Sequence, residues 1–365
     1  MTHSRLLVNL AFLSQKPTGL SNYALNLFPH LWALDPLILC PEFAPLQTDP
    51  KRSSRTQFTS PQLSPDQGLK GHLRRLLWTQ FRLPHFYRQH QSPLLFCPIP
   101  EAPLGQGCST VVMVHDFIPL RFSNPRSFLS LYFKFYLPWI LKQSRHILCN
   151  SQSTAADIQH FCGIADRHIT VIPLAYNTDR YYPQNLPHQN YFLYIGRPDP
   201  HKNLRRVLEA FVQIAPQTDA ELWIGGSADP RYTPALQSVV AAHDLRDRVK
   251  FLGYIPDQDL PLLLNQSLAL IFPSLWEGFG LPVLEAMACG TPVITSNQSA
   301  LPEVAGEAAL LVDPYKVGSI AEAMEAIVNE PGLRQALRQR GLVQAQQFSW
   351  QKTGAKTIEV LSRFL

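Results

Sequence analysis

Short apolar runs alternate with amphipathic, helix-length segments along most of this 365-residue sequence, and this alternation constrains the fold more than any other feature. Runs such as RLLVNL, PLILC and STVVMV have the length and apolar character of buried strands. Segments between them, such as LSNYALNLFPHLW, have the periodicity of helices. Strands that alternate with helices build parallel sheets covered by helices. The sequence therefore predicts an α/β protein.

The alternation occurs twice, on either side of a segment rich in proline and asparagine. Residues 173–190, PLAYNTDRYYPQNLPHQN, are typical of a linker between domains. We therefore expect two doubly wound, Rossmann-like domains, at residues 1–177 and 178–347. The segment FSWQKTGAKTIEVLSRF predicts a last helix within residues 348–365. Residues 41–70 are rich in proline, serine, threonine and glutamine, and predict a long loop.

Composition excludes several classes of protein. Hydrophobic residues make up 45% of the chain and charged residues 16%, which excludes a disordered chain and a coiled coil. No uninterrupted run of 18 apolar residues occurs, so we expect no membrane-spanning helix, and the N-terminus predicts a first strand rather than a signal peptide. The six cysteines form no CxxC pair, which favours free thiols in the reducing cytoplasm.

Positive charge is concentrated in the first half of the chain. Residues 1–177 contain 16 Lys+Arg and 8 Asp+Glu, a net charge of +8, whereas residues 178–365 contain 16 and 19, a net charge of -3. Residues 70–92 combine arginines with leucines and aromatic residues, so one interpretation is a peripheral contact with an anionic membrane. The other interpretation is a basic helix that covers the first domain. No nucleic-acid-binding module is recognisable, and we expect no such partner.

A glycine-containing loop in residues 271–296, IFPSLWEGFGLPVLEAMACGTPVITS, is the most informative stretch. It joins a buried strand to a helix that begins near Pro282, and Gly278 and Gly280 would let a ligand approach the backbone closely. The N–H groups at such a helix start can bind an anion. The segment predicts either a site for a phosphorylated ligand or only a tight turn between a strand and a capped helix.

Two carboxylates flank this loop. Glu277 precedes the glycines, and Glu285 lies in the otherwise small and apolar run VLEAMAC, where a carboxylate is costly unless it is hydrogen-bonded. Such a pair suits a polyhydroxylated ligand. The loop lacks the third glycine of the dinucleotide-binding fingerprint, because Val283 occupies that position.

Charged residues also follow other predicted strands. Arg197 and Lys202 flank a turn after NYFLYIG, and His115 follows STVVMV together with Asp116. Ligands bind outside the carboxyl ends of the strands in open parallel sheets. Arg197 and Lys202 are therefore candidates for binding phosphate and His115 for binding or proton transfer, although solvated cations and a loop-capping His-Asp pair explain the same residues. Gly19, between the first strand and helix, is a weaker candidate.

Together these residues resemble family 4 of the retaining glycosyltransferases, which have the GT-B fold. Glu277 and Glu285, in EGFGLPVLE, match the E-x7-E motif of that family, and Arg197 and Lys202 match its spaced Arg/Lys pair. VHDFIPL, NSQSTAADI and FSWQKTGAKTIEVL resemble three further segments of its members. The resemblance covers nearly the whole chain.

The resemblance implies an architecture and a role for each residue. The domain at 1–177 lies on the acceptor side, the domain at 178–347 binds the nucleotide sugar across a cleft, and the helix in 348–365 crosses back to the first domain. Catalysis is assigned to His115, Glu277, Arg197 and Lys202. Donor binding is assigned to Gly19, Arg197, Lys202, Tyr254, Ile255, Glu277, Gly278, Phe279, Gly280, Leu281 and Glu285. Neither a metal nor a cofactor is expected, because the two cations take the place of a metal.

The implied reaction is the retaining transfer of a hexose from a nucleotide-diphosphate sugar to a glycan or lipid-linked acceptor in polysaccharide biosynthesis. We expect UDP-glucose as the donor, with a GDP-mannose-dependent mannosyltransferase as the alternative. Two functions of another class stay open, namely a nucleotide-sugar epimerase and a non-catalytic nucleotide-sugar binding protein. The expected location is the cytoplasm, with peripheral contact at the cytoplasmic face of the membrane.

Overall fold

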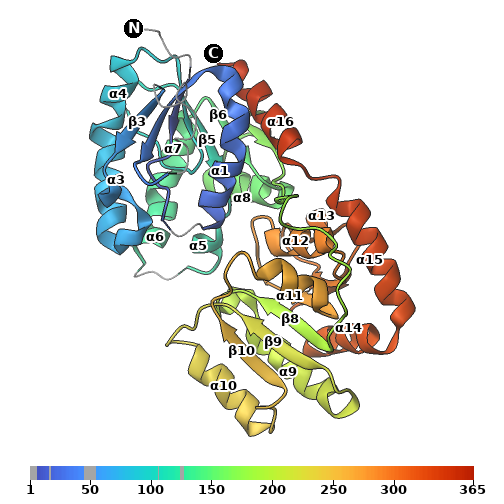
Figure 1. The fold of residues 1–365 in the computed structure, drawn as a ribbon. Helices are drawn as coiled ribbons and strands as arrows, with labels where there is room; N and C mark the ends of the chain where they lie inside the picture. Colours follow the sequence, from blue (N-terminus) through green and yellow to red (C-terminus); the bar gives the residue numbers. More distant parts are fainter. Residues whose placement is uncertain (1–5, 16–17, 45–54, 106, 124–126) are drawn as a thin grey trace. The chain divides into compact units, whose positions relative to one another are not determined.

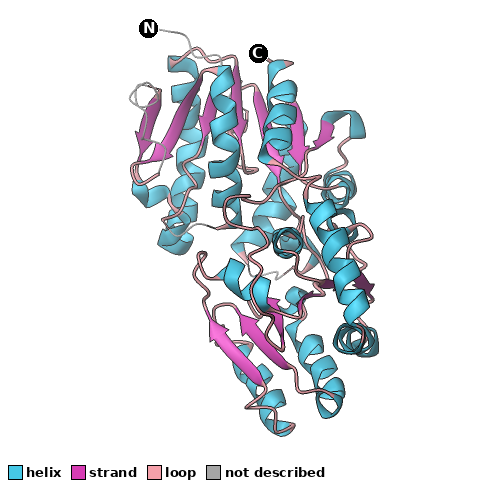
Figure 2. Cartoon of the chain, turned by 45° about the vertical axis from the view of Figure 1, so that its right-hand side comes forward, coloured by secondary structure: helices cyan, strands magenta, loops and turns pink. Residues whose placement is uncertain are grey.

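The computed structural model describes the chain except for residues 1–5, 16–17, 45–54, 106 and 124–126. The chain divides into two compact units, one formed by residues 1–174 and 350–365 and the other by residues 175–349. Both units are α/β structures in which helices pack along a sheet (Figures 1 and 2). None of the helices described is long and apolar enough to cross a membrane.

The first unit contains a seven-stranded sheet in the order β3-β2-β1-β4-β5-β6-β7, and every strand pair is parallel. Its strands are β1 (Leu6–Asn9), β2 (Pro36–Pro41), β3 (Thr56–Thr59), β4 (Leu94–Cys97), β5 (Thr110–Val114), β6 (His146–Cys149) and β7 (Ile169–Val171). Its helices are α1 (Gly19–Leu31), α3 (Gly68–Phe81), α4 (Leu83–Gln89), α5 (Ile118–Arg121), α6 (Phe128–Leu131), the π-helical η4 (Tyr132–Tyr136), α7 (Leu137–Gln143), α8 (Gln152–Cys162) and α16 (Trp350–Ser362).

Helix α16 returns to the first unit and packs against α1. The two helices approach closely at Gly354, where an added Cβ would lie 2.5 Å from the Cβ of His30. The Thr353 hydroxyl donates a hydrogen bond to the carbonyl of Pro173 at 2.8 Å. The last helix is therefore an integral part of this unit.

The second unit contains a six-stranded parallel sheet in the order β10-β9-β8-β11-β12-β13. Its strands are β8 (Tyr191–Ile195), β9 (Glu221–Gly225), β10 (Val249–Gly253), β11 (Ala269–Phe272), β12 (Val293–Ser296) and β13 (Leu310–Val312). Its helices are α9 (Leu204–Ile214), α10 (Thr233–Ala242), α11 (Leu260–Gln266), α12 (Leu281–Cys289), α13 (Leu301–Ala305), α14 (Val317–Asn329) and α15 (Pro331–Ala345).

The prediction of a long loop over residues 41–70 is wrong in part. Residues 56–59 form β3, which pairs with β2 at the edge of the sheet, and α3 begins at Gly68. Three of the four residues of TQFT are polar and Phe58 is the exposed one, so this edge strand has no apolar signature in the sequence. Residues 45–54 of the predicted loop lie outside the described part of the chain.

The cysteines behave as core residues rather than as a disulfide framework. All six are free thiols, and five of them are buried. Burial raises the pKa of Cys40 to about 12, since a thiolate is costly among apolar groups. The prediction of free thiols is confirmed.

Candidate functional site

The loop between β11 and α12 brings the backbone to the carboxyl edge of the second sheet. Gly280 directly precedes α12 and has a φ of +104°, a conformation that favours glycine. A Cβ at this position would lie 2.5 Å from Cδ2 of Leu301. Pro282 occupies the first turn, where its missing N–H costs nothing. Pro282 has no N–H and the Val283 N–H donates to the Gly280 carbonyl at 3.0 Å, so in this turn the Leu281 N–H and the helix dipole supply the partial positive charge.

Phe279 and Leu281 flank Gly280 and contribute differently. The Phe279 side chain is buried and its ring centroid lies 5.9 Å from that of Phe348, whereas Leu281 is half-buried. Gly278 is also buried. Because the Phe279 ring is part of the core, only the backbone of residues 278–280 is suited to contacting a ligand.

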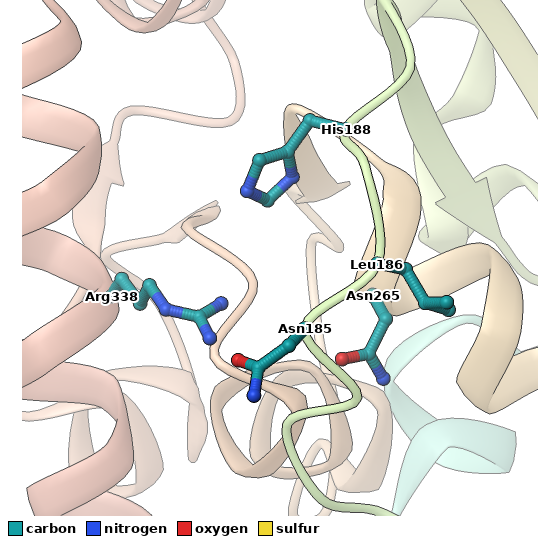
Figure 3. Close-up of a pocket in the computed structure, with 5 residues that line it drawn as sticks. All are labelled: Asn185, Leu186, His188, Asn265 and Arg338. Atoms are coloured by element: carbon teal, nitrogen blue, oxygen red, sulfur yellow. The ribbon is translucent and has the colours of Figure 1, made fainter.

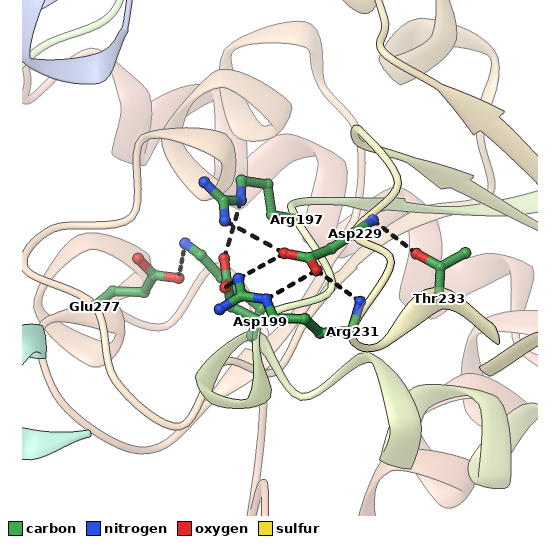
Figure 4. Close-up of polar contacts among 7 residues, drawn as sticks. Arg197, Asp199, Asp229, Arg231, Thr233 and Glu277 are labelled. Carbon is green, nitrogen blue, oxygen red and sulfur yellow. Dashed lines mark hydrogen bonds and ion pairs between the residues drawn. The ribbon is translucent and has the colours of Figure 1, made fainter. Parts of the chain in front are cut away.

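Lys202 and Glu277 form an ion pair at the same edge of the sheet. Lys202 ends a short turn after β8, and its Nζ donates to Oε1 of Glu277 at 2.6 Å. The Glu277 backbone N–H donates to the Ser299 hydroxyl at 3.0 Å, which anchors the backbone at this position. Both side chains are largely buried, so solvent screens this pair less than an exposed one. Figure 4 shows Glu277 beside a second group of charges.

Arg197 belongs to that second group, which has two acids and two arginines (Figure 4). Its Nε lies 3.2 Å from Oδ2 of Asp199, and its Nη2 lies 3.7 Å from Oδ2 of Asp229. Arg231 contacts the same Asp229 oxygen at 2.6 Å. Hydrogen bonds from Arg231 hold the pKa of Asp229 down at about 2, so this carboxylate is ionised at neutral pH. The Arg197 side chain is 61% exposed, so it can reach a ligand.

Sequence reasoning missed Asp199, Asp229 and Arg231. Asp229 and Arg231 lie in the turn after β9, and Arg197 and Asp199 lie after β8. β8 and β9 are adjacent and parallel, so their following loops meet at one edge. The polar run GSADPR after a strand was a signal that could have identified them.

Glu285 has a separate environment on α12. The side chain is half-buried, and burial raises its pKa to about 7. A hydrogen bond with Tyr181 and the charge of Arg180 oppose this rise, while Asp257 adds to it. Arg180 itself pairs with Asp257 at 3.2 Å. The carboxyl group of Glu285 is therefore ready to change its protonation near neutral pH.

Tyr254 and Ile255 follow β10 and differ in exposure. The Tyr254 side chain is exposed, whereas Ile255 is half-buried and packs over Gly225 at the end of β9, where a Cβ would collide with it. Tyr254 is free to stack on a planar ligand. Ile255 has a fixed position against the sheet.

His115 and Gly19 belong to the first unit. His115 is buried after β5, and burial lowers its pKa to about 4, so the ring is neutral at pH 7. Nε2 lies 2.8 Å from the carbonyl of Pro98, which assigns the hydrogen to Nε2 and leaves a lone pair on Nδ1. The ring also packs edge-on against Tyr23, with centroids 4.7 Å apart. Gly19 is exposed at the first residue of α1, which the Thr18 side chain caps.

A hollow of about 300 Å³ in the second unit lies away from these residues (Figure 3). It is lined by Asn185, Leu186, His188, Asn265 and Arg338. Arg338 donates to the carbonyl of Gly290, at the C-terminal end of α12, whereas the glycine loop is at the N-terminal end. A nine-residue helix is about 13 Å long, so the hollow and the glycine loop are distinct places. Within the described residues, no group of three potential metal ligands occurs.

Comparison with known proteins matches each half of the chain to a family model. Residues 17–180 match Glycosyltransferase Family 4, and residues 180–343 match Glycosyl transferases group 1. O-antigen chain mannosyltransferase B of Escherichia coli is 39% identical over 47% of this chain and 45% of its own length. O-antigen chain mannosyltransferase RfbU of Salmonella typhimurium is 33% identical over 60% of this chain and 61% of its own length. The chain thus spans less than two thirds of either relative.

Solved structures resemble the whole chain. Sucrose-phosphate synthase from Thermosynechococcus elongatus has a TM-score of 0.78 at 20% identity and covers 98% of both chains. Anabaena HepE in complex with UDP-glucose has a TM-score of 0.75 at 17% identity, over 98% of this chain and 99% of that one. At this identity the likeness concerns the fold alone. It confirms the predicted GT-B architecture of two Rossmann-like domains.

Proposed function

Because its two halves match the family 4 and group 1 glycosyltransferase models, the chain is a glycosyltransferase of this type, and we propose that it transfers mannose from GDP-mannose. The observation that carries this proposal is the activity for which the relatives are named. Three of them that are 30–39% identical are named mannosyltransferases. The expected UDP-glucose donor therefore gives way to the GDP-mannose alternative, and the O-antigen relatives support a glycan acceptor in polysaccharide biosynthesis.

In this proposal the charged groups of the second unit bind the donor diphosphate. Arg197 offers a planar fork to phosphate oxygens and Lys202 offers a point charge. The N–H groups at the start of α12 add further donors. Negative charge grows on the diphosphate as it leaves, so fixed cations stabilise the transition state more than the ground state.

The two carboxylates act on the hydroxyl groups of the donor. Glu285 accepts hydrogen bonds from the ribose, and Glu277 with the backbone of residues 278–280 holds the mannose. Tyr254 and Ile255 flank the base. Glu277 must exchange its bond to Lys202 for bonds to the sugar, which frees the Lys202 ammonium for the diphosphate.

The chemical step retains the configuration of the sugar. The bond between mannose C1 and the diphosphate oxygen breaks while the acceptor oxygen forms a bond to C1 on the same face. The acceptor proton passes to the departing phosphate oxygen. The His115 ring is neutral at pH 7, because burial lowers its pKa to about 4, and its part in catalysis stays a prediction from the family resemblance. Neither a metal nor a cofactor is part of this proposal, and a lipid-linked acceptor would bring the enzyme to a membrane surface.

Calorimetric titration of GDP, GDP-mannose, UDP and UDP-glucose into the wild type and Lys202→Met tests the donor. We expect guanine nucleotides to bind more tightly than uracil nucleotides, and Lys202→Met to weaken GDP binding about 10- to 100-fold, the value of a charge-assisted hydrogen bond. Lys250→Met is the matched control, because Lys250 also pairs with a glutamate in this unit, Glu221 at 2.6 Å, near the opposite ends of the strands. Preference for UDP, or equal weakening by both variants, would contradict the proposal. Binding without mannose transfer to any glycan acceptor would leave only a non-catalytic binding protein.

A further inference from the structure

The outer face of helix α3 carries an exposed apolar stripe. Leu69, Leu73, Leu77 and Phe81 are spaced four residues apart, so they lie along one side of the helix. All four side chains are exposed, and Phe81 has the largest exposed fraction, 69%. A helix on the surface of a soluble domain normally has the opposite arrangement, with its apolar side inward.

The inward side of α3 is polar instead. Its buried residues are Gly71, Arg75 and Thr79. Arg75 donates from Nε and Nη2 to the two carboxylate oxygens of Glu101, at 2.6 and 2.7 Å, and from Nη1 to the carbonyl of Leu63. Arg75 therefore does not contribute to the basic character of residues 70–92 at the surface, because this cation is neutralised inside the unit. The inward side of the helix therefore carries a buried ion pair, while Leu69, Leu73 and Leu77 are exposed.

A second exposed apolar stripe runs along α6, η4 and α7. Leu131, Phe135 and Trp139 are again spaced four residues apart, and Trp139 is 68% exposed. The loop between β4 and β5 contacts both helices. On α3, the Gln80 side chain accepts a hydrogen bond from the N–H of Leu104. From the other helix, Gln143 accepts one from the N–H of Gly105.

Both stripes also lie on one face of the first sheet. The helices that carry them pack into a single hydrophobic core, with Trp78 from α3 and Phe133, Leu137 and Ile140 from η4 and α7. The two stripes are thus parts of one outward surface. We call the outward side of α3, α6, η4 and α7 the docking surface.

The charge of the docking surface selects its partner. Residues 68–89 and 128–143 contain seven Lys+Arg and no Asp or Glu. Besides the buried Arg75, the cations on the helices of the docking surface, Lys70, Arg74, Lys134 and Lys142, are exposed. A second copy of this chain would place cations against cations, which opposes self-association through this face. Exposed leucine and aromatic side chains flanked by lysine and arginine fit the headgroup region of an anionic bilayer.

We propose that the docking surface binds to the headgroup layer of a membrane that contains anionic lipid. Phe81, Phe135 and Trp139 enter the interface between headgroups and acyl chains, while the exposed lysines and arginines contact lipid phosphate. This inference extends beyond the transfer reaction and does not depend on the donor. It enlarges the contact expected for residues 70–92, because α6, η4 and α7 add a second exposed apolar stripe.

Sedimentation of the full chain with phosphatidylglycerol–phosphatidylcholine vesicles, in the absence of any nucleotide, tests the proposal. We expect binding to the mixed vesicles, little binding to pure phosphatidylcholine, and loss of binding as salt is raised. The double variant Phe81→Ser, Trp139→Ser should lower the partition coefficient at least about tenfold, since two large side chains no longer enter the lipid. The control double variant Val343→Ser, Tyr315→Ser removes two exposed apolar side chains from the other unit and should bind like the wild type.

A second pair of variants tests the charges. Arg74→Gln with Lys134→Gln should weaken binding to anionic vesicles several-fold, whereas Arg205→Gln with Lys316→Gln, which removes two exposed cations from the second unit, should not. Each variant should have the circular dichroism spectrum of the wild type, which shows that it is folded.

Three results would overturn the inference. They are no binding of the wild type to anionic vesicles, equal binding of the apolar variant and its control, and a wild-type dimer in solution that the apolar variant dissociates. Because GDP binding is measured separately, failure of the vesicle assay does not bear on the proposed transfer reaction, and the reverse also holds.

Discussion

Replacing Glu285 by glutamine should change how the stability of the chain depends on pH. Burial raises the pKa of Glu285 from 4.5 to about 7 in the folded chain, where Tyr181, Arg180 and Asp257 surround it. Between these two pH values the folded protein keeps a proton on this carboxyl group that the unfolded chain has already lost. Unfolding then releases a proton, so the free energy of unfolding falls as pH rises, by about 1.4 kcal/mol per pH unit. Above pH 7 the total loss reaches about 3 kcal/mol.

Urea unfolding of the wild type and Glu285→Gln at several pH values between about 5 and 8 measures this loss. Glutamine does not titrate, so the stability of the variant relative to the wild type should rise by about 2–3 kcal/mol across this range. Glu325→Gln, on the exposed side of α14, is the control and should follow the wild-type pH dependence. Parallel curves for wild type and Glu285→Gln would refute the reasoning, because they would mean that Glu285 titrates alike in the folded and unfolded chains.

Two further substitutions test the packing of the units, both by urea unfolding. Gly280→Ala should lower stability by about 2–4 kcal/mol, since the positive φ and the leucine side chain 2.5 Å from the new Cβ both oppose a side chain. Gly318→Ala is the control and should not lower stability, because its new Cβ meets no atom within 4 Å. Equal effects of the two variants would contradict this view of the loop. Arg75→Met should cost about 3–5 kcal/mol, because the Glu101 carboxylate loses its buried partner, whereas the exposed Arg74→Met should stay within about 0.5 kcal/mol. A small effect at Arg75 would mean that this side chain is solvated after all.

The sequence predicted those parts of the site that depend on local order along the chain. In a parallel sheet every strand delivers its following loop to the same edge, so Arg197, Lys202 and the glycine loop could be assigned to one place from their positions alone. Gly278 and Gly280 were identifiable because a strand and a proline-started helix enclose them.

Features that depend on pairs of distant residues could not be predicted. The bond between Lys202 and Glu277 joins positions 75 residues apart, and Asp229 reaches Arg197 only because β9 lies beside β8. Nothing in the sequence indicates that Arg75 points inward, because a leucine-rich basic helix is expected to bury its leucines. The donor could not be read from the sequence either, since the pattern of cations and carboxylates recognises the diphosphate and hydroxyl groups that nucleotide sugars share.

Because Lys202 is paired with Glu277, an incoming anion must compete with the Glu277 carboxylate for the Lys202 ammonium group. An incoming anion does not meet a bare ammonium group but must displace a carboxylate that is already bound at 2.6 Å. Inorganic phosphate offers Lys202 one interaction and offers Glu277 nothing in return, so the exchange leaves a carboxylate without a partner in a poorly solvated place. A sugar diphosphate compensates both groups at once, with phosphate oxygens for the lysine and hydroxyl groups for the glutamate. Under the proposed function, the pair therefore disfavours small anions and favours a molecule that carries both chemical groups.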